Sequence, residues 1–218
     1  MIVHLLEYQI LPGHAAEVEG FVRQFLSGSS HVGLLARCAG RRLSVDGPRY
    51  IVMSAWRDAE VFRIGTNSAG MPRDLASRAA LIRRRLPSQF RAVEWHGLNW
   101  CDARVLRLYR ASMAREGLEA WERSVSGELH EIVGKPGITA ALAGVAILDE
   151  EDPSHAQIIV LTAWRDWDSL LGATGGRLNR PILGTEDAGP QSPSLADHYE
   201  LIDAEANGEA APQPDSSG

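Results

Sequence analysis

Residues 33–40 read GLLARCAG and residues 137–144 read GITAALAG, so similar stretches lie 104 positions apart (137 − 33 = 104). A second match follows, because residues 54–58 read SAWRD and residues 162–166 read TAWRD, at an offset of 108 (162 − 54 = 108). The four extra residues fall between the two matches, where a loop tolerates an insertion. The pattern predicts one module of about 100 residues that is written twice in the chain.

The hydrophobic pattern predicts the same order of strands and helices in each copy, with one further helical stretch in the first copy. Alternation over residues 2–10 indicates a strand, and apolar residues three and four apart over 15–26 indicate an amphipathic helix. The first copy continues with strands 34–45 and 50–56, a helix from Asp58, a helical stretch over 75–86 and a strand over 90–98. The second copy is predicted to hold strands 104–111, 138–148, 157–164 and 198–202, helices 116–132 and from Asp166, and a long loop over 172–194.

This order, β-α-β-β-α-β, predicts an α+β protein of two ferredoxin-like modules, residues 1–98 and 103–203, with a disordered tail at 204–218. A four-stranded sheet with helices on one face leaves its other face uncovered. We therefore expect the two modules to pack sheet to sheet about a pseudo-two-fold axis, as a barrel closed within one chain. Any homodimer should then use helices or edge strands.

Composition excludes several classes of function. Hydrophobic residues make up 44% of the chain and charged residues 23%, and no apolar run approaches the roughly 20 residues that span a bilayer. The first residues have no basic region or cleavage site, so we expect no membrane contact and a cytoplasmic location. A net charge of −6 argues against nucleic acid, and the basic run 83–85 is expected on a solvated helix face.

The tryptophan at each strand-to-helix junction, Trp56 and Trp164, stands in an Ala-Trp-x-Asp motif within a ferredoxin-like module. This combination resembles the antibiotic biosynthesis monooxygenase (ABM) family of the dimeric α+β barrel superfamily, over residues 2–98 and 104–202. The resemblance implies a tandem barrel. Members of the family include small quinone-forming oxygenases that need no metal or flavin, haem-degrading enzymes and proteins of unknown role, so the resemblance leaves these three possibilities open.

The resemblance to the haem-degrading branch fails at two positions. That branch uses an asparagine on the first strand and a histidine on the helix after the tryptophan, and neither copy has them. Without an axial imidazole the haem iron has no ordinary protein ligand. No metal-ligand spacing and no Gly-rich dinucleotide fingerprint is present either. We therefore expect no haem, flavin or metal, and a colourless protein whose partner is a small-molecule ligand.

A cofactor-independent oxygenase needs a base, an apolar pocket and hydrogen-bond donors for the developing oxyanion. His4 and Tyr8 share one face of the first strand and are the candidate catalytic residues. The candidate substrate-binding residues are polar or aromatic side chains of the tryptophan-bearing faces and of the strand that corresponds to the first: Ser54, Trp56, Arg107 and Trp164. Structural roles stay open, because strand hydroxyls are often satisfied by neighbours and tryptophans often fill cores.

Differences between the copies indicate which copy holds the site. The sequence match places His4 against Val105 and Leu6 against Arg107. An imidazole opposite an aliphatic side chain predicts a ligand site in the first copy, while Arg107 would suit an anionic ligand or a buried carboxylate. Two functions remain open: a cofactor-independent monooxygenase acting on a small aromatic or lipophilic substrate, and a noncatalytic binding or scaffold protein.

Overall fold

The computed structural model describes residues 1–27, 31–42, 47–68, 82–147, 154–178 and 195–206. These residues form an α+β fold with eight antiparallel strands and four α-helices. No helix in these ranges is long and apolar enough to cross a bilayer. In chain order the elements are β1 (Ile2–Ile10), α1 (Ala15–Leu26), β2 (Leu34–Arg42), β3 (Arg49–Trp56), α2 (Ala59–Ser68), β4 (Ile82–Leu98), the 3-10 helix η2 (Trp100–Asp102), β5 (Val105–Ala114), α4 (Arg115–Val133), β6 (Ile138–Ala146), β7 (His155–Trp164), α5 (Trp167–Thr174) and β8 (Leu195–Ala206).

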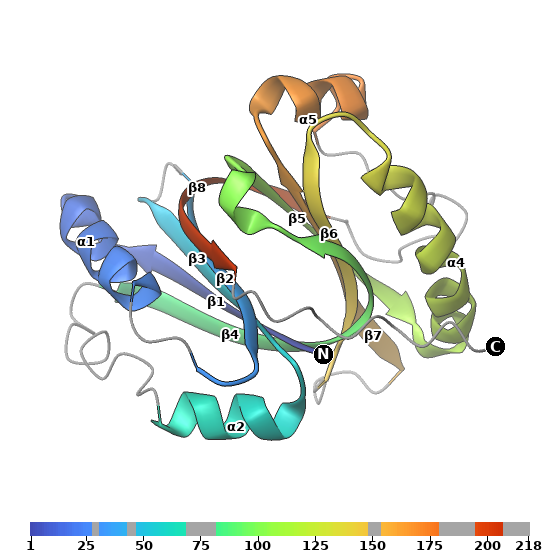
Figure 1. Cartoon of the computed structure of the whole chain (residues 1–218), viewed down its shortest axis with the longest axis horizontal. Coiled ribbons are helices and arrows are strands. Elements are labelled where there is room, and N and C mark those ends of the chain that lie inside the picture. The colour runs from blue at the N-terminus through green and yellow to red at the C-terminus, as the bar shows by residue number, and fades with distance from the viewer. Residues whose placement is uncertain (28–30, 43–46, 69–81, 148–153, 179–194, 207–218) are drawn as a thin grey trace.

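The eight strands close a barrel in the order β1-β3-β2-β8-β5-β7-β6-β4. Each half of the chain contributes four adjacent strands in the same order, β4-β1-β3-β2 from the first and β8-β5-β7-β6 from the second. Two seams join the halves, one between β2 and β8 and one between β4 and β6. The α-helices lie around the outside of the barrel, with α1 and α2 beside the first half and α4 and α5 beside the second (Figure 1).

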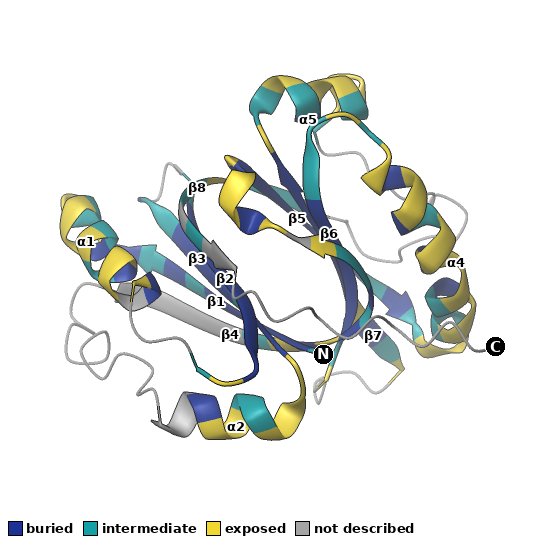
Figure 2. Cartoon of the chain, viewed as in Figure 1, coloured by how far each residue is buried: buried dark blue, intermediate teal, exposed yellow. Residues whose placement is uncertain are grey.

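Strand alternation divides the apolar side chains between the barrel interior and the helix-covered outer face. On β1, Val3 and Leu5 are fully buried inside the barrel, in one cluster with Leu106 of β5. The alternate residue Tyr8 packs outside, against Val18 of α1. The strands are therefore buried on both faces, whereas the outer faces of the helices are exposed (Figure 2).

The two ends of the barrel interior have different chemistry. Trp100, in the segment that links the halves, is fully buried in the interior cluster. Because neighbouring strands are antiparallel all the way round, β1 and β5 both run from this end toward the other. There Glu7 of β1 pairs with Arg110 of β5, and the Tyr199 hydroxyl donates to Glu7 Oε2 at 3.1 Å. An ion pair thus crosses the barrel between the two halves.

The helical stretch predicted over 75–86 is wrong where the structure describes it. Residues 82–86 belong to β4, and 69–81 lie outside the described residues. Arg85 is paired with Tyr8, so the basic run follows β1 along a strand instead of lying on a helix. Apolar residues three and four apart predicted a helix, but pairing with the whole length of β1 overrides that local preference.

The last strand is longer than the sequence predicts. β8 spans Leu195–Ala206 instead of 198–202, and Ala206 pairs with Ala36 of β2. The first three residues of the predicted tail, 204–206, are therefore strand. Residues 207–218, and 179–194 of the predicted loop 172–194, lie outside the described residues, while 172–174 complete α5.

Candidate functional site

The two tryptophan junctions have the same local geometry. Trp56 Nε1 donates a hydrogen bond to Ser54 Oγ at 2.8 Å, and Trp164 Nε1 donates to Thr162 Oγ1 at 2.9 Å. Both indoles are buried, at 5% and 0% exposed. Each hydroxyl therefore fixes the indole two residues later on the same strand face.

An aspartate begins the helix after each tryptophan. Asp58 Oδ1 accepts from the backbone N–H of Val61 at 2.8 Å, and Asp166 Oδ1 accepts from that of Ser169 at 2.7 Å. These hydrogen bonds to the charged form hold the pKa of both carboxyl groups below its usual value. The aspartates of the repeated motif are N-caps and serve the fold.

A glycine allows each of these helices to approach the sheet. Gly33 and Gly137 have φ of +77° and +82°, and their main-chain carbonyls accept from the N–H of Arg57 and Arg165. A Cβ at Gly33 would lie 2.5 Å from Val61 Cγ1, and one at Gly137 would lie 2.1 Å from the hydroxyl of Ser169. The first turns of α2 and α5 therefore lie directly against these glycines.

Three of the predicted residues of the first half, His4, Ser54 and Trp56, lie together beneath α2. His4 is paired with Ser54 across β1 and β3 and is 7% exposed. Phe62 of α2 covers them, with its ring centroid 5.2 Å from that of His4 and 5.9 Å from that of Trp56. His31 stacks on the indole of Trp56 at 6.3 Å. We call His4, Ser54, Trp56 and Phe62 the first cluster.

Tyr8 lies in a different place, under α1. It packs with Val22 of α1 and with its cross-strand partner Tyr50. Tyr8 lies four positions after His4 in an extended strand, which corresponds to about 13 Å along β1. The structure does not bring these two candidate catalytic residues together around one small molecule.

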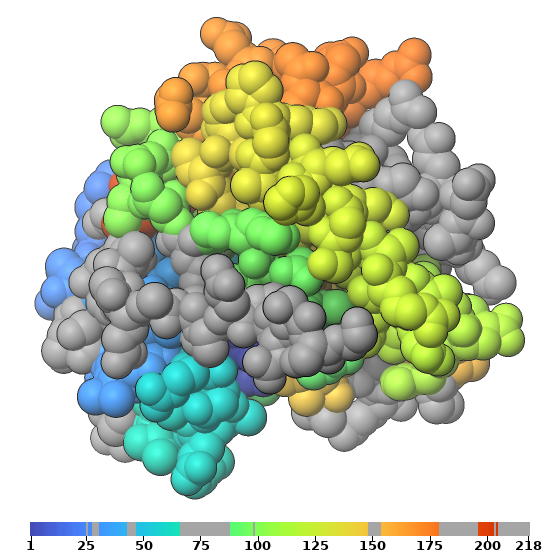
Figure 3. Space-filling view, turned by 45° about the vertical axis from the view of Figure 1, so that its right-hand side comes forward, coloured from blue at the N-terminus to red at the C-terminus, as the bar shows by residue number. Residues whose placement is uncertain are grey.

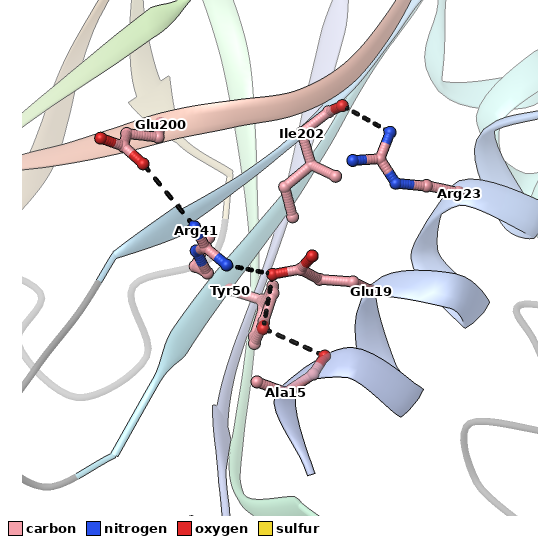
Figure 4. Close-up of polar contacts among 7 residues, drawn as sticks. All are labelled: Ala15, Glu19, Arg23, Arg41, Tyr50, Glu200 and Ile202. Atoms are coloured by element: carbon pink, nitrogen blue, oxygen red, sulfur yellow. Dashed lines mark hydrogen bonds and ion pairs between the residues drawn. The ribbon is translucent and has the colours of Figure 1, made fainter. Parts of the chain in front are cut away.

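The polar contacts beside Tyr8 hold α1 on the sheet. The hydroxyl of Tyr50 donates to Glu19 Oε1 at 3.2 Å, and Arg41 Nη1 donates to the same oxygen at 2.5 Å (Figure 4). Burial, followed by the charge of Glu19, raises the pKa of Tyr50 to about 12. The phenol therefore stays protonated at neutral pH, and the network serves as a helix anchor.

Arg107 occupies the corresponding place in the second half. It is paired with Thr162 on one side and His198 on the other, and is 1% exposed. Its Nη2 donates to the carbonyl oxygen of Leu178 at 3.5 Å, and its guanidinium carbon lies 5.8 Å from the ring centroid of Tyr109. Burial lowers the pKa of Arg107 to about 10, so it remains a cation at neutral pH.

The predicted alignment of His4 with Val105 is wrong. His4 faces Ser54 and Arg107 faces Thr162, so His4 corresponds to Arg107 (107 − 4 = 103), and Ile2 corresponds to Val105. A shift of two residues keeps every side chain on the same face, so alternation could not reveal the error. Both halves carry a nitrogen-bearing side chain at this position, and the asymmetry argument for the first copy fails.

The sequence analysis missed His198. This residue of β8 is half-buried, its Nε2 has no hydrogen-bond partner in the described part of the chain, and its ring lies 5.9 Å from that of Trp167. Burial, then the charges of Arg107 and Arg42, lower the pKa of His198 to about 4. The corresponding residue of β4 is Gln89, which faces His4. Only the pairing register of β5 and β8, which sets His198 beside Arg107, would have identified His198 as a candidate.

We call Arg107, Thr162, Trp164 and His198 the second cluster. It contains two of the predicted substrate-binding residues, Arg107 and Trp164. Neither cluster resembles a metal centre, and the described ranges hold no group of three or more His, Cys, Asp or Glu side chains placed to bind a metal ion.

Several solved structures share this fold over nearly their whole length. A candidate monooxygenase of Fusobacterium nucleatum is 10% identical, with 98% of this chain and 97% of that chain covered and a TM-score of 0.75. One from Lactobacillus acidophilus is 13% identical, with 94% and 95% covered and a TM-score of 0.71. An anthrone oxidase-like protein is 11% identical, with 98% and 96% covered and a TM-score of 0.67.

No protein-family model and no curated protein matches the sequence. At such low identities the structural likeness shows a shared fold only. The chemistry of this chain depends on the side chains of the two clusters.

Proposed function

We propose that the chain is a tandem member of the ABM group, a dimeric α+β barrel within one polypeptide, and that it oxidises a small aromatic or lipophilic substrate without a cofactor. The equal strand order of the halves and their matching Trp–hydroxyl hydrogen bonds support duplication. The fold is shared with structures named as monooxygenases. The observation that carries the proposal is the first cluster, in which the ring of Phe62 packs against both the imidazole of His4 and the indole of Trp56.

The reaction that fits this group is the oxidation of an activated methylene group flanked by aromatic rings. In the balanced reaction, one methylene compound and one dioxygen molecule give one ketone and one water. The methylene carbon supplies the four electrons that reduce dioxygen, and its two hydrogens enter the water. One oxygen atom enters the ketone and the other leaves as water. His4 would take the first proton and form the electron-rich anion that reacts with dioxygen, while Trp56 and Phe62 would hold the ring. Tyr8 lies under α1, away from His4, and would not contact a substrate held by Trp56 and Phe62.

One observation favours the noncatalytic alternative. The ring of Phe62 packs against both His4 and Trp56, and the hydroxyl of Ser54 accepts the hydrogen bond of the indole. Side chains of the protein itself therefore contact His4 and Trp56. A substrate that reaches His4 must displace the Phe62 ring, whereas a scaffold protein would keep it in place.

Oxygen consumption with hydroxylated anthrones, which carry such a methylene group, tests the proposal. We expect turnover by the wild type, and a loss of about a hundredfold in kcat/KM in His4→Val, because general base catalysis contributes at least that factor. Tyr8→Phe should lose less, and His130→Gln, on the exposed side of α4, should match the wild type. Binding of these compounds without oxygen consumption would support the scaffold alternative, and full activity of His4→Val would exclude His4 as the base.

A further inference from the structure

The second cluster differs from the first in charge. Where the first half has His4 beside Gln89, the second has Arg107 beside His198. Cross-strand neighbours have Cβ atoms about 5 Å apart, so these side chains lie within reach of one ligand. Because α2 and α5 lie at opposite ends of the face in Figure 3, the two clusters beneath them are separate sites.

Two residues that neighbour Arg107 carry buried polar atoms without partners among the residues that the structure describes. Within the described ranges, neither Nε2 of His198 nor the hydroxyl of Tyr109 has a hydrogen-bond partner, although both atoms are buried. Tyr109 is 2% exposed and follows Arg107 on the same face of β5. Buried polar atoms of this kind are satisfied by water or by a bound ligand.

The protonation states at this site favour an anion. Arg107 is a cation, and its planar group has five N–H donors that match a carboxylate. Arg42 also contributes to lowering the pKa of His198, but it is paired with Asp197, so Arg107 is the cation available to an anion here. His198 itself is neutral at neutral pH, so its ring can donate a hydrogen bond without adding a charge. Trp167, half-buried at the start of α5, places an aromatic ring beside it.

We propose that the second cluster binds a small aromatic carboxylate. The guanidinium group of Arg107 and the hydroxyl of Tyr109 donate to the carboxylate, and the aromatic ring of the ligand lies against Trp167 and His198. The inference concerns binding in the half of the barrel opposite to His4. It does not depend on whether the first cluster catalyses an oxidation.

Titration with sodium benzoate tests the inference, with benzamide as the neutral probe of nearly the same shape. In two-dimensional 1H–15N spectra we expect benzoate to shift the indole N–H signals of Trp164 and Trp167, and to leave that of Trp56 in place. Because benzamide lacks the charge that pairs with Arg107, it should bind about tenfold more weakly or worse.

Variants locate the anion. Arg107→Met should weaken benzoate binding about tenfold or more, since it removes the charged donor group. Arg107→Lys keeps the charge but loses the planar donor pair, so it should weaken binding about threefold or more, and it serves if the methionine variant does not fold. Arg165→Met, an exposed arginine at the end of β7, makes the same charge change and should bind as the wild type does.

The inference would be overturned if benzoate and benzamide bind equally, if neither binds, or if the Arg107 variants keep the wild-type affinity for benzoate. Shifts confined to Trp56 would also overturn it, because the ligand would then occupy the first cluster.

Discussion

His198 makes the stability of the protein depend on pH. Its pKa in the folded state is about 4, below its ordinary value of 6.5. Between these two values the unfolded chain binds more protons than the folded one, so stability falls as the pH falls from about 6.5 to 4. We expect His198→Gln to remove part of this loss, about 1 kcal/mol once the partial exposure of the ring is allowed for. Urea unfolding at pH 7 and pH 4 measures it.

The control for this prediction is His130→Gln on the exposed side of α4, which should keep the wild-type pH dependence. An identical acid sensitivity in His198→Gln and the wild type would contradict the prediction, and would show that His198 titrates alike in both states.

At the scale of single residues, alternation predicted faces correctly but not neighbours. Ser54 and Trp56 share a face, as the period of two requires, and their hydrogen bond follows from that spacing. The sequence could not show that His4 of the first half corresponds to Arg107 of the second. Shifting the alignment of the two halves by two residues leaves every side chain on the same strand face. His198 was missed for the same reason, since only the register shows that it lies beside Arg107.

At the scale of elements, a glycine sets how closely α2 approaches the sheet. A Cβ at Gly65 would lie 2.3 Å from Cζ3 of the Trp56 indole. We expect Gly65→Ala to displace the helix or the indole and to destabilise the protein by about 1–3 kcal/mol, the usual effect of overpacking. Thermal and urea unfolding provide the measurement, and changed fluorescence of Trp56 should accompany it.

Gly20→Ala is the matched control, because this exposed glycine of α1 has nothing within 4 Å of the added Cβ. Alanine there should stabilise the helix by about 0.5–1 kcal/mol. Equal effects of the two substitutions would contradict the close contact between α2 and Trp56.

Element positions could be predicted where local pattern and tertiary contacts agree. The helix predicted over 15–26 matches α1, since its apolar face is the one packed on β1 and β3. The helix predicted over 75–86 was wrong at its end, because residues 82–86 pair with β1 and no local periodicity reports such a distant partner. Long-range pairing also extended β8 to Ala206.

At the scale of the molecule, Trp100 fills one end of the barrel. It is fully buried among side chains of both halves, including Leu35 and Ala140. We expect Trp100→Ala to destabilise the protein by about 3–5 kcal/mol, the range for truncating a buried aromatic residue. Urea unfolding gives the value.

The control is Cys101→Ser, on the exposed side of the same 3-10 helix, whose stability should stay within about 0.5 kcal/mol of the wild type. A similarly small effect of Trp100→Ala would contradict the role of Trp100 in filling this end of the barrel.

At the other end, the pair of Glu7 and Arg110 should couple the two halves. We expect a double-mutant cycle with Glu7→Gln and Arg110→Met to give a coupling energy of about 1–3 kcal/mol, because the side chains are in contact and mostly buried. The free energies of unfolding of the four proteins supply the cycle. Additive effects would mean that the ion pair does not hold the halves together.

The repeat predicted two sets of four strands, and the barrel has them in matching order. Comparison of the two copies could not reveal Trp100, because it lies in the connection and has no counterpart in the other copy. Nor could it reveal Glu7 with Arg110, since contacts across the barrel depend on how the halves meet. The sequence repeat thus predicted the strands of each half but not the interior side chains that join the two halves.

The seam between β2 and β8 bears on how the protein is made. β2 pairs with β3 on one side and with β8 on the other, and of the described strands β8 is synthesised last. Until residues 195–206 appear, β2 and β5 each present an open edge of unpaired backbone N–H and C=O groups to other nascent chains. Closure of the barrel therefore has to wait for the synthesis of β8, and the first half remains with its edge open until the second is complete.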